Sequence, residues 1–258
     1  QRIVGNACGS HYCKGEKTQF TSNSLGLHDA GRMRIYASTQ AHSSVEKGAG
    51  VAGFGRKNLV RIAVRGDNSI DPDALERAVE KDIADGFTPC CAVATLGTTG
   101  TTAVDSLREV GEVCRKHDLW MHVDAALGGT ALLLPEMRWM TDGIEYVDSL
   151  VFNPHKWMFT NFDCSAYFVR DAASLIRTFE ILPEYLKTRT RGKVNDYRDW
   201  GIPLGRRFRA LKLWAVIRSY GVEGLQSAIR EHLRLAKMLA GLVEADGRFE
   251  LVAPVPLN

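Results

Sequence analysis

The sequence predicts an α/β fold with a mainly parallel sheet that is flanked by helices. From about residue 33 onward, short apolar runs alternate with stretches of helical periodicity. Strands that alternate with helices are typical of β-α-β units, in which each helix covers one face of the sheet. The 258 residues are 45% hydrophobic and 24% charged, which is enough apolar material for one large core.

The first part of the chain supplies the alternating elements. The segment 71–86 is predicted to be a helix because Asp71 is a suitable cap, Pro72 falls in the first turn and Gly86 ends the pattern. A second helix is expected at 105–117. The predicted strands are 59–64, 90–97, 119–126, 149–153 and 165–170.

The pattern changes after the last of these strands. Residues 182–201 are charged and aperiodic, and so long a segment without periodicity inside a compact domain is usually either functional or disordered. Two long helices are expected at 203–220 and 222–245, followed by a strand at 248–254. A strand without a successor cannot build a domain, so we expect it to begin a C-terminal domain that lies mostly outside this sequence.

Composition argues against several classes of protein. The net charge of +3 is too small to indicate a nucleic-acid partner, and no apolar run approaches the ~20 residues of a membrane span. The six cysteines form no pattern of a secreted disulfide framework, which indicates a reducing, cytoplasmic location. Cys8 and Cys13 flank His11, but this loose spacing lacks a second half, so no metal site is predicted.

Chemically useful side chains gather where the predicted strands end. Thr99 follows the strand 90–97, Asp124 follows LWMHV near the end of the strand 119–126, and His42 precedes a helical pattern. The sequence NPHKW places Lys156 just after the strand 149–153. Functional groups of parallel α/β sheets collect at such strand ends. The signatures of zinc peptidases, serine hydrolases and P-loop NTPases are absent from the sequence.

A lysine and an aspartate at neighbouring strand ends suit pyridoxal phosphate. The amine of Lys156 would bind the aldehyde of the cofactor covalently, and the carboxylate of Asp124 would keep the pyridine nitrogen protonated. A histidine could stack on the ring, and a threonine hydroxyl could bond its phenolic oxygen. Each residue alone has an ordinary structural explanation, such as a surface lysine or a helix cap, so the prediction depends on their joint order.

Several longer motifs carry a family resemblance. These are STQAHSSVEKG, VATLGTT, HVDAALGG, NPHKW followed by NFDCSA, and DYRDWGIPLGRRFRALKLW. Together they resemble the group II pyridoxal-phosphate decarboxylases, in the branch of the aromatic-L-amino-acid, tyrosine and histidine decarboxylases. The resemblance runs from about residue 34 to 256. The glutamate decarboxylase branch shares NPHK but lacks the context of Trp157 and DYRDW.

The resemblance implies a role for each matching residue within a fold-type I large domain. Lys156 would carry the cofactor and Asp124 would pair with its ring nitrogen. His42 would stack on the ring and carry protons, and Thr99 would contact the phenolic oxygen. The remaining implied cofactor neighbours are Ala126 beneath the ring, and Asn153 and His155 beside the phosphate. Tyr185 would belong to a mobile catalytic loop, which accounts for the aperiodic segment.

The resemblance also divides the chain. Residues 1–31 do not resemble the family and lack its Gly/Ser-Glu-Ala phosphate loop. Residues 32–246 would form most of the cofactor-binding large domain, and 247–258 would begin the small C-terminal domain.

The implied function is decarboxylation of an aromatic L-amino acid to its amine and carbon dioxide, by a cytoplasmic homodimer. The expected partner is this small-molecule substrate, with neither nucleic acid nor membrane. Two alternatives remain. An aldehyde synthase would decarboxylate the same substrate and oxidise the resulting carbanion, although that branch typically has Phe where this chain has Tyr185. A catalytically dead, truncated homologue would only dimerise. The residues do not select one aromatic substrate.

Overall fold

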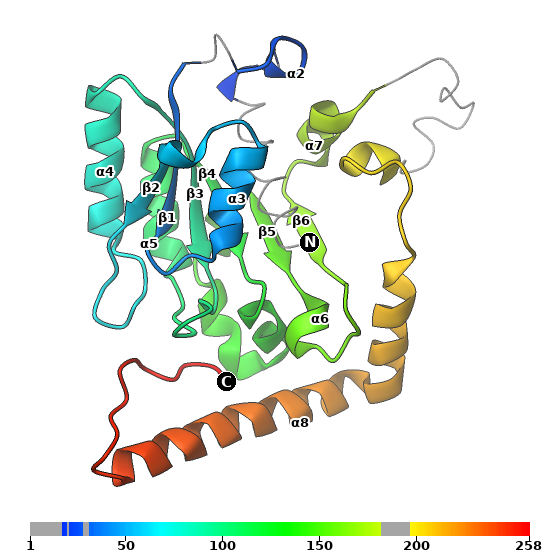
Figure 1. Cartoon of the computed structure of the whole chain (residues 1–258). Coiled ribbons are helices and arrows are strands. Elements are labelled where there is room, and N and C mark those ends of the chain that lie inside the picture. Colours follow the sequence, from blue (N-terminus) through cyan, green and yellow to red (C-terminus); the bar gives the residue numbers. More distant parts are fainter. Residues whose placement is uncertain (1–16, 20, 28–30, 182–196) are drawn as a thin grey trace.

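A computed structural model describes residues 17–19, 21–27, 31–181 and 197–258 of the chain. Its centre is a six-stranded sheet with the order β2-β1-β3-β4-β5-β6 (Figure 1). The strands are β1 Met33–Ser38, β2 Leu59–Ile62, β3 Thr88–Thr95, β4 Trp120–Asp124, β5 Ser149–Phe152 and β6 Ala166–Val169. All neighbours are parallel except β6, which pairs antiparallel with β5. The predicted mainly parallel sheet is therefore confirmed.

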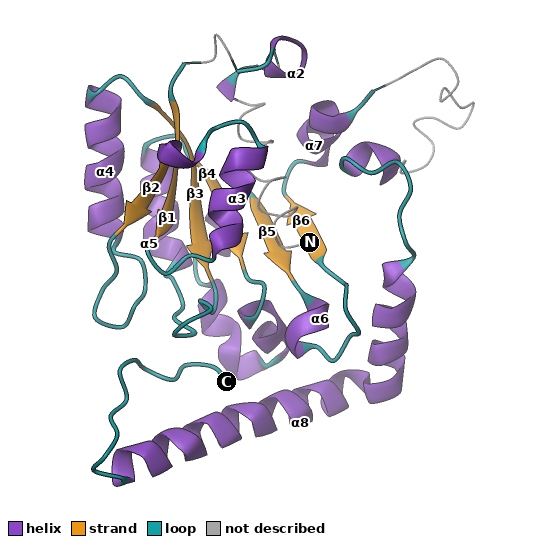
Figure 2. Ribbon diagram, viewed as in Figure 1, coloured by secondary structure: helices purple, strands orange, loops and turns teal. Residues whose placement is uncertain are grey.

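Helices cover both faces of the sheet (Figure 2). The α-helices are α2 Ser22–Leu25, α3 Ser43–Val51, α4 Pro72–Ala84, α5 Leu107–Lys116, α6 Pro154–Trp157, α7 Ala172–Phe179 and α8 Arg209–Ala245. Short 3-10 helices lie at Arg56–Asn58, Gly128–Leu133, Pro135–Thr141, Ile144–Tyr146 and Tyr197–Trp200. None of the helices in the described residues is long and apolar enough to cross a membrane.

Two apolar clusters lie on opposite faces of the sheet. Tyr36 of β1 joins the cluster made with α4 and α5, whereas its neighbours Ile35 and Ala37 join the cluster made with α3. This alternation follows from the pleat, because successive side chains of a strand point to opposite faces. The same rule decides which side chains of β4 face α3.

The predicted helix at 71–86 is confirmed, and the contacts at its two ends show why the local sequence was enough to identify it. Oδ1 of Asp71 accepts hydrogen bonds from the backbone N–H groups of Asp73 and Ala74, at 3.0 and 3.2 Å. Gly86 follows the last turn with φ of +77°. An acceptor at the N-cap and a left-handed glycine beyond the C-terminus satisfy the unpaired backbone groups of the helix ends.

The two predicted long helices form one element, α8, with a break at Gly221. Gly221 has φ of +65° and ψ of 175°, a conformation open mainly to glycine, so the chain turns there between two helical segments. In Figure 1 the second segment runs beneath the carboxyl ends of the strands. Leu225 and Ile229 are buried, and Nε2 of Gln226 donates to the Leu133 carbonyl at 2.7 Å.

The predicted strand at 248–254 is wrong. These residues form no strand, and Phe249 and Val252 are 63% and 86% exposed. The segment instead returns from the end of α8 to the body, where Leu257 is buried in the cluster that includes α4 and α5 (Figure 1).

The cysteines also differ in part from the expectation. Cys91, Cys114 and Cys164 are buried free thiols, and burial raises the pKa of Cys91 and Cys114 above the ordinary thiol value. Cys90 is disulfide-bonded, which the sequence did not predict.

Candidate active site

The carboxyl ends of β3, β4 and β5 lie side by side. Thr95, the last residue of β3, pairs with Asp124, the last residue of β4, and Asp124 pairs in turn with Val151 of β5. Since the three strands are parallel, the loops that follow them leave the sheet at one edge. This edge carries most of the residues predicted to bind a cofactor.

Asp124 points to the side of the sheet that α3 covers. Its neighbours Met121 and Val123 belong to the cluster with α4 and α5, whereas Trp120 packs against the cluster with α3. The strand alternation therefore turns Asp124 toward α3. The Asp124 residue is fully buried, and a buried carboxylate is costly unless something binds it.

Two hydrogen bonds connect Asp124, Ala126 and Asn153 in series. Oδ1 of Asp124 accepts from the N–H of Ala126 at 3.2 Å. The carbonyl of Ala126 accepts from the N–H of Asn153 at 3.2 Å. Ala126 and Asn153 are both 1% exposed. The structure thus brings these three residues together behind the strand ends.

The loops after β3 and β4 approach each other so closely that glycine is needed. The N–H of Gly128 donates to the Leu96 carbonyl at 3.1 Å, and a Cβ on Gly128 would lie 2.5 Å from that oxygen. The N–H of Leu96 donates to the Asp124 carbonyl at 3.0 Å. These contacts fix the positions of the two loops relative to Asp124.

Lys156 lies on the short helix α6, which follows β5. Its N–H donates to the Asn153 carbonyl at 2.9 Å, so Asn153 begins the turn that carries the lysine. The Lys156 residue is exposed, whereas the sequence suggested a lysine at a buried strand end. Nδ2 of Asn153 is buried without a hydrogen-bond partner in the described part of the structure, and Oδ1 accepts from Ser165 Oγ at 2.5 Å.

His155 is fixed against the segment that follows α6. The N–H of Cys164 donates to Nδ1 of His155 at 3.0 Å, and the N–H of His155 donates to the Cys164 carbonyl at 3.3 Å. Burial lowers the pKa of His155, and the positive charge of Lys156 lowers it further. The imidazole is therefore predominantly neutral at neutral pH.

His42 reaches the same edge from β1 and caps α3. Its Nδ1 accepts from the N–H of Ser44 at 3.0 Å and lies 2.8 Å from Ser44 Oγ. Because Nδ1 is an acceptor, the neutral ring carries its proton on Nε2. His42 is partly exposed.

Two threonines follow β3, and the structure separates their roles. Thr98 is fully buried, and its Oγ1 accepts from the N–H of Ala103 at 3.0 Å and lies 2.9 Å from Thr101 Oγ1. Thr99 is exposed at the tip of the same loop. Thr98 thus shapes the loop, and Thr99 is the threonine that could meet a ligand. Tyr185 lies outside the described residues.

A buried hydrogen-bond chain beneath Asp124 was not recognised from the sequence. The indole of Trp120 donates to Ser149 Oγ at 2.9 Å, and Ser149 Oγ lies 2.8 Å from Nδ1 of His122. Burial lowers the pKa of His122 to about 4, although the nearby Asp124 charge acts in the opposite direction. Its position two residues before Asp124 could have shown that both face one side of the sheet.

A second missed residue is Asp105, at the end of the loop after β3. It is 1% exposed and accepts hydrogen bonds from the backbone N–H groups of Ile70 and Thr95, each at 2.7 Å. Burial raises the pKa of Asp105 to about 7, against the lowering effect of these two bonds. In the sequence this aspartate resembles an ordinary helix cap.

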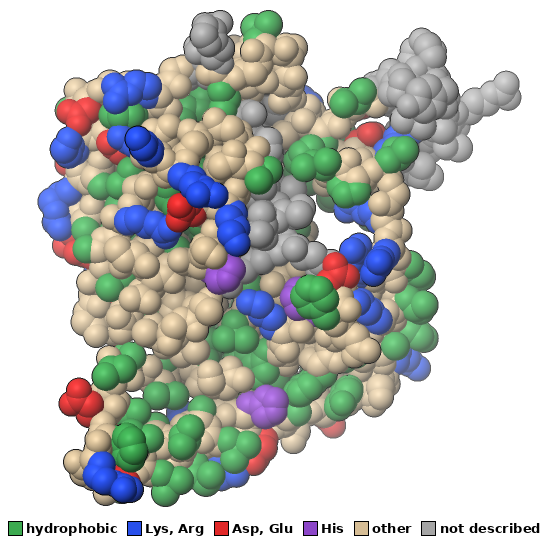
Figure 3. Space-filling model, viewed as in Figure 1, with side chains coloured by type: hydrophobic (Ala, Val, Ile, Leu, Met, Phe, Trp, Pro, Cys, Tyr) green, Lys and Arg blue, Asp and Glu red, His purple; other side chains and the backbone are tan. Residues whose placement is uncertain are grey.

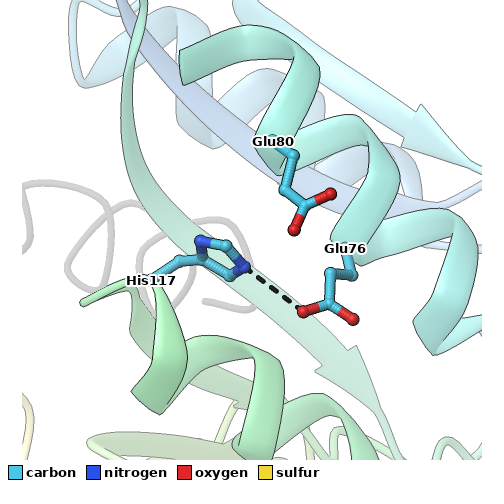
Figure 4. A group of neighbouring side chains, drawn as sticks. All are labelled: Glu76, Glu80 and His117. Atoms are coloured by element: carbon cyan, nitrogen blue, oxygen red, sulfur yellow. Dashed lines mark hydrogen bonds and ion pairs between the residues drawn. The ribbon is translucent and has the colours of Figure 1, made fainter. Parts of the chain in front are cut away.

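One cluster of possible metal ligands lies away from this edge. Glu76 and Glu80 of α4 approach His117 at the end of α5, with ligand atoms within 4.8 Å of one another (Figure 4). Lys116 Nζ lies 2.5 Å from Glu76 Oε1 and 3.6 Å from Glu80 Oε1. The ammonium group pairs with both carboxylates, so the cluster acts as an ion-pair network between α4 and α5.

The family model for the pyridoxal-dependent decarboxylase conserved domain matches residues 16–257. The chain belongs to this family. The match begins within the segment 1–31, which the sequence motifs did not connect to the family. The pyridoxal-dependent decarboxylase domain therefore includes the sheet, the strand-end loops and α8.

Relatives of this decarboxylase domain are named aromatic-L-amino-acid decarboxylases. One from Drosophila lebanonensis is 52% identical over 223 residues, which are 86% of this chain and 55% of the relative. One from Cavia porcellus is 49% identical over 229 residues, 88% of this chain and 47% of the relative. The chain spans about half the length of the curated relatives it matches.

Solved structures of the family share the fold. The structure of Oryza sativa TDC with PLP and tryptamine superposes with a TM-score of 0.94 at 38% identity, covering 100% of this chain and 53% of that one. A Rhodiola rosea 4-hydroxyphenylacetaldehyde synthase superposes at 0.89 with 34% identity, covering 100% and 52%. The fold is thus shared by proteins named for different reactions.

The described residues fit the cofactor of this decarboxylase family. A buried carboxylate at Asp124 suits a cationic ring nitrogen, and the exposed amine of Lys156 is accessible to an aldehyde. The amide Nδ2 of Asn153 has no hydrogen-bond partner among the described residues, so it is a spare donor at the same edge. All three groups lie on loops or strand ends that hydrogen bonds hold together.

Proposed function

We propose that this chain is the greater part of the cofactor-binding domain of a decarboxylase that converts an aromatic L-amino acid to its amine and carbon dioxide. The observation that carries the proposal is the position of Asp124, buried at the end of β4 on the side of α3. It lies beside the strand whose following helix carries Lys156. The identity of about half of all aligned residues to proteins named aromatic-L-amino-acid decarboxylase supports the aromatic substrate class.

Pyridoxal phosphate, when bound, supplies a protonated pyridine ring that accepts the electron pair released as the carboxylate leaves. Asp124 would hold the proton on the ring nitrogen, because a buried carboxylate stabilises an adjacent cation. Lys156 would hold the cofactor covalently. His42 would stack on the ring and present a proton on Nε2, while Thr99 would donate its hydroxyl to the phenolic oxygen.

The remaining residues would shape the site. Ala126 has a side chain small enough to leave room beneath the ring. Asn153 would donate its free amide Nδ2 to the phosphate, and His155 would lie beside it with a predominantly neutral imidazole. Because His155 carries little charge, the phosphate would depend on neutral donors on this side of the site.

We also propose that the whole protein is a cytoplasmic homodimer that binds a small-molecule substrate and neither nucleic acid nor membrane. Apolar side chains are exposed along α8, where the space-filling view shows a largely apolar surface (Figure 3). These include Leu211, Trp214, Tyr220, Leu239 and Leu242, which are 49–61% exposed. Large exposed apolar surfaces are typical of protein interfaces.

The amine is favoured over the aldehyde as product because of Tyr185. By resemblance, this tyrosine belongs to the catalytic loop and would protonate the α-carbon after carbon dioxide leaves. The family's aldehyde synthases typically have phenylalanine there. The fold itself does not separate the two reactions, since a protein named as an aldehyde synthase superposes closely.

The test is to reduce the holoprotein with borohydride and to locate the pyridoxyl label by peptide mass spectrometry. We expect the label on Lys156. The matched control is Lys47→Ala, which removes an exposed lysine of α3 and should keep both the label and the activity. Labelling of another lysine would overturn the assignment of Lys156, and a protein that takes up no cofactor would support the catalytically dead homologue.

The reaction itself is tested on the full-length protein with tyrosine, DOPA, tryptophan, phenylalanine and histidine. Carbon dioxide, amine and hydrogen peroxide are measured together under air. We expect equal amounts of carbon dioxide and amine with at least one aromatic substrate. Peroxide and aldehyde in place of the amine would instead identify an aldehyde synthase.

A further inference from the structure

Asp105 is a buried carboxylate that binds two separate backbone segments. Its Oδ1 accepts from the N–H of Ile70 and its Oδ2 from the N–H of Thr95, both at 2.7 Å. It forms no ion pair with any lysine, arginine or histidine among the described residues. A buried carboxylate without a counter-charge costs free energy, so its two bonds must serve the structure or the site.

The bond between Asp105 and Thr95 completes the end of β3. Val93 is the last residue of β3 that pairs with β1, so Thr95 extends beyond its neighbour on that side. The N–H of Thr95 donates to the Asp105 carboxylate, and the N–H of Asp105 donates to the Thr95 carbonyl at 3.0 Å. Asp105 therefore takes the place of a neighbouring strand at this point. On its other side, Thr95 pairs with Asp124.

The same contacts close the loop that carries Thr99. Residues 96–104 leave the sheet after Thr95 and return at Asp105. Within the loop, the N–H groups of Gly97 and Thr98 both donate to the Ala103 carbonyl at 3.0 Å. The bonds between Asp105 and Thr95 form the base of this loop, and so they limit where its tip can lie.

The bond between Asp105 and Ile70 joins the loop to the turn before α4. Ile70 is 2% exposed, and it forms a bridge with Val64 after the turn that follows β2. Releasing Oδ1 of Asp105 would free this turn from the end of β3. The carboxylate thus connects three chain segments, although none of its atoms belongs to the proposed cofactor contacts.

We propose that Asp105 is a positioning residue, which holds the end of β3 and the loop 96–104 so that Asp124 and Thr99 meet the cofactor correctly. This inference rests on the proposed function. It deepens that function because Asp105 would act through Thr95 and would not touch the cofactor. An amide in place of the carboxylate keeps one acceptor but turns an NH₂ group toward one of the two N–H donors, so one segment would be released.

The test compares Asp105→Asn with Asp82→Asn in the holoprotein. Asp82 is a matched control because it is also buried, at 7% exposure, and binds Tyr36 Oη at 3.0 Å away from the strand ends. We expect both substitutions to lower the urea midpoint. Only Asp105→Asn should weaken pyridoxal phosphate binding, by about tenfold or more, and change the visible circular dichroism of the bound cofactor.

A purely structural role would lower stability in both variants and leave the cofactor signals alone. The inference is therefore overturned if Asp105→Asn binds pyridoxal phosphate within about threefold of the parent with unchanged visible circular dichroism. If the parent itself binds no pyridoxal phosphate, the proposed function fails as well. Cofactor binding by the parent therefore distinguishes a failure of this inference alone from a failure of the proposed function.

A second measurement needs no variant and covers the case in which Asp105→Asn does not fold. Coupling between two sites is reciprocal, so cofactor binding must stabilise the bonds of Asp105 if these bonds favour cofactor binding. We expect added pyridoxal phosphate to slow hydrogen exchange at the Ile70 and Thr95 amides of the parent. Unchanged exchange at the Ile70 amide in a protein that binds the cofactor would overturn the inference.

Discussion

The indole Nε1 of Trp157 donates a 3.0 Å hydrogen bond to Nδ1 of His232. Trp157 is the residue after Lys156 and is 3% exposed, and His232 lies on the second segment of α8. Phe159 extends the contact, because its ring lies 5.7 Å from His232 and 5.6 Å from Tyr220. The helix that carries Lys156 is therefore attached to α8 by aromatic packing and one directional bond.

Trp157→Phe should test this attachment. Phenylalanine keeps much of the apolar volume but leaves Nδ1 of His232 without its donor, and we expect a loss of about 1–2 kcal/mol in the free energy of unfolding. Urea denaturation measures the loss. Trp139→Phe is the control, since Trp139 is 56% exposed and should change stability by less than about 0.5 kcal/mol. Equal effects at the two positions would show that the bond to His232 contributes nothing.

Asp124→Asn should reduce turnover strongly while the protein remains folded. An amide provides no negative charge to hold a proton on the ring nitrogen, and losses of comparable electrostatic contacts raise barriers by about 3–4 kcal/mol, which corresponds to roughly 100–1,000-fold in rate. Steady-state amine release at saturating cofactor measures the effect. Asp73→Asn, at an exposed position, should retain the parent rate. A rate for Asp124→Asn within about threefold of the parent would exclude the proposed role.

His122 should make the protein sensitive to acid. Burial lowers its pKa to about 4 in the folded state, from 6.5 in the unfolded chain. Between these values the unfolded chain binds a proton that the folded protein does not, so stability is lost as the pH falls from 6.5 to 4. The full contribution is roughly 3 kcal/mol, since each pKa unit corresponds to about 1.4 kcal/mol.

His122→Gln removes this titration. Its free energy of unfolding should therefore decline less steeply than that of the parent between pH 6.5 and 4, whatever its stability at pH 7. Urea denaturation at several pH values gives both slopes. Identical slopes would mean that folding does not lower the pKa of His122.

Asp105 should change the pH dependence of stability in the direction opposite to His122, over a similar pH range. Burial raises its pKa to about 7 in the folded state, from 3.8, so the folded protein binds the additional proton between these values. Its contribution to stability therefore grows as the pH falls from about 7 to 3.8. Asp105→Asn should lose this gain, so its free energy of unfolding should decline more steeply on acidification than that of the parent. The same series of urea titrations measures this decline. A shallower decline in Asp105→Asn than in the parent would contradict the raised pKa of the buried carboxyl group.

The helices that the sequence predicted best are those with local end signals. Asp71, Pro72 and Gly86 act within a few residues of the helix they bound, so the sequence contains the whole explanation. Gly221 is similar, because a glycine between two periodic segments already indicates a break. The strand predicted at 248–254 failed because a strand needs a partner, and its pairing depends on parts of the fold that a local apolar run does not report.

The candidate site likewise contains residues that local sequence signals identify and residues whose role depends on contacts between distant parts of the chain. The order of His42, Asp124 and Lys156 along the β-α-β pattern was enough to predict that they share one edge of the sheet. Asp105 could not be recognised, because its importance comes from burial against Ile70 and Thr95, which only the folded chain brings together. His122 is intermediate, since strand alternation places it beneath Asp124 but does not reveal its bond to Ser149.

The last prediction concerns Leu257, which packs against the loops of the site. It is 1% exposed, and its Cδ1 would lie 2.9 Å from a Cβ on Gly97 and 3.4 Å from one on Gly128. Leu257→Ala should leave a cavity beneath both loops and cost about 2–5 kcal/mol in the free energy of unfolding. The midpoint of urea denaturation measures this loss.

The matched control is Val252→Ala, five residues earlier in the same returning segment. Val252 is 86% exposed, so its truncation should change stability by less than about 0.5 kcal/mol. If Leu257 holds the loops, its substitution should also speed hydrogen exchange at the amides of Leu96 and Gly128, whose bonds span the two loops. If Leu257→Ala is as mild as Val252→Ala and leaves this exchange unchanged, the segment does not dock beneath the site, and the loops are held by their own hydrogen bonds alone.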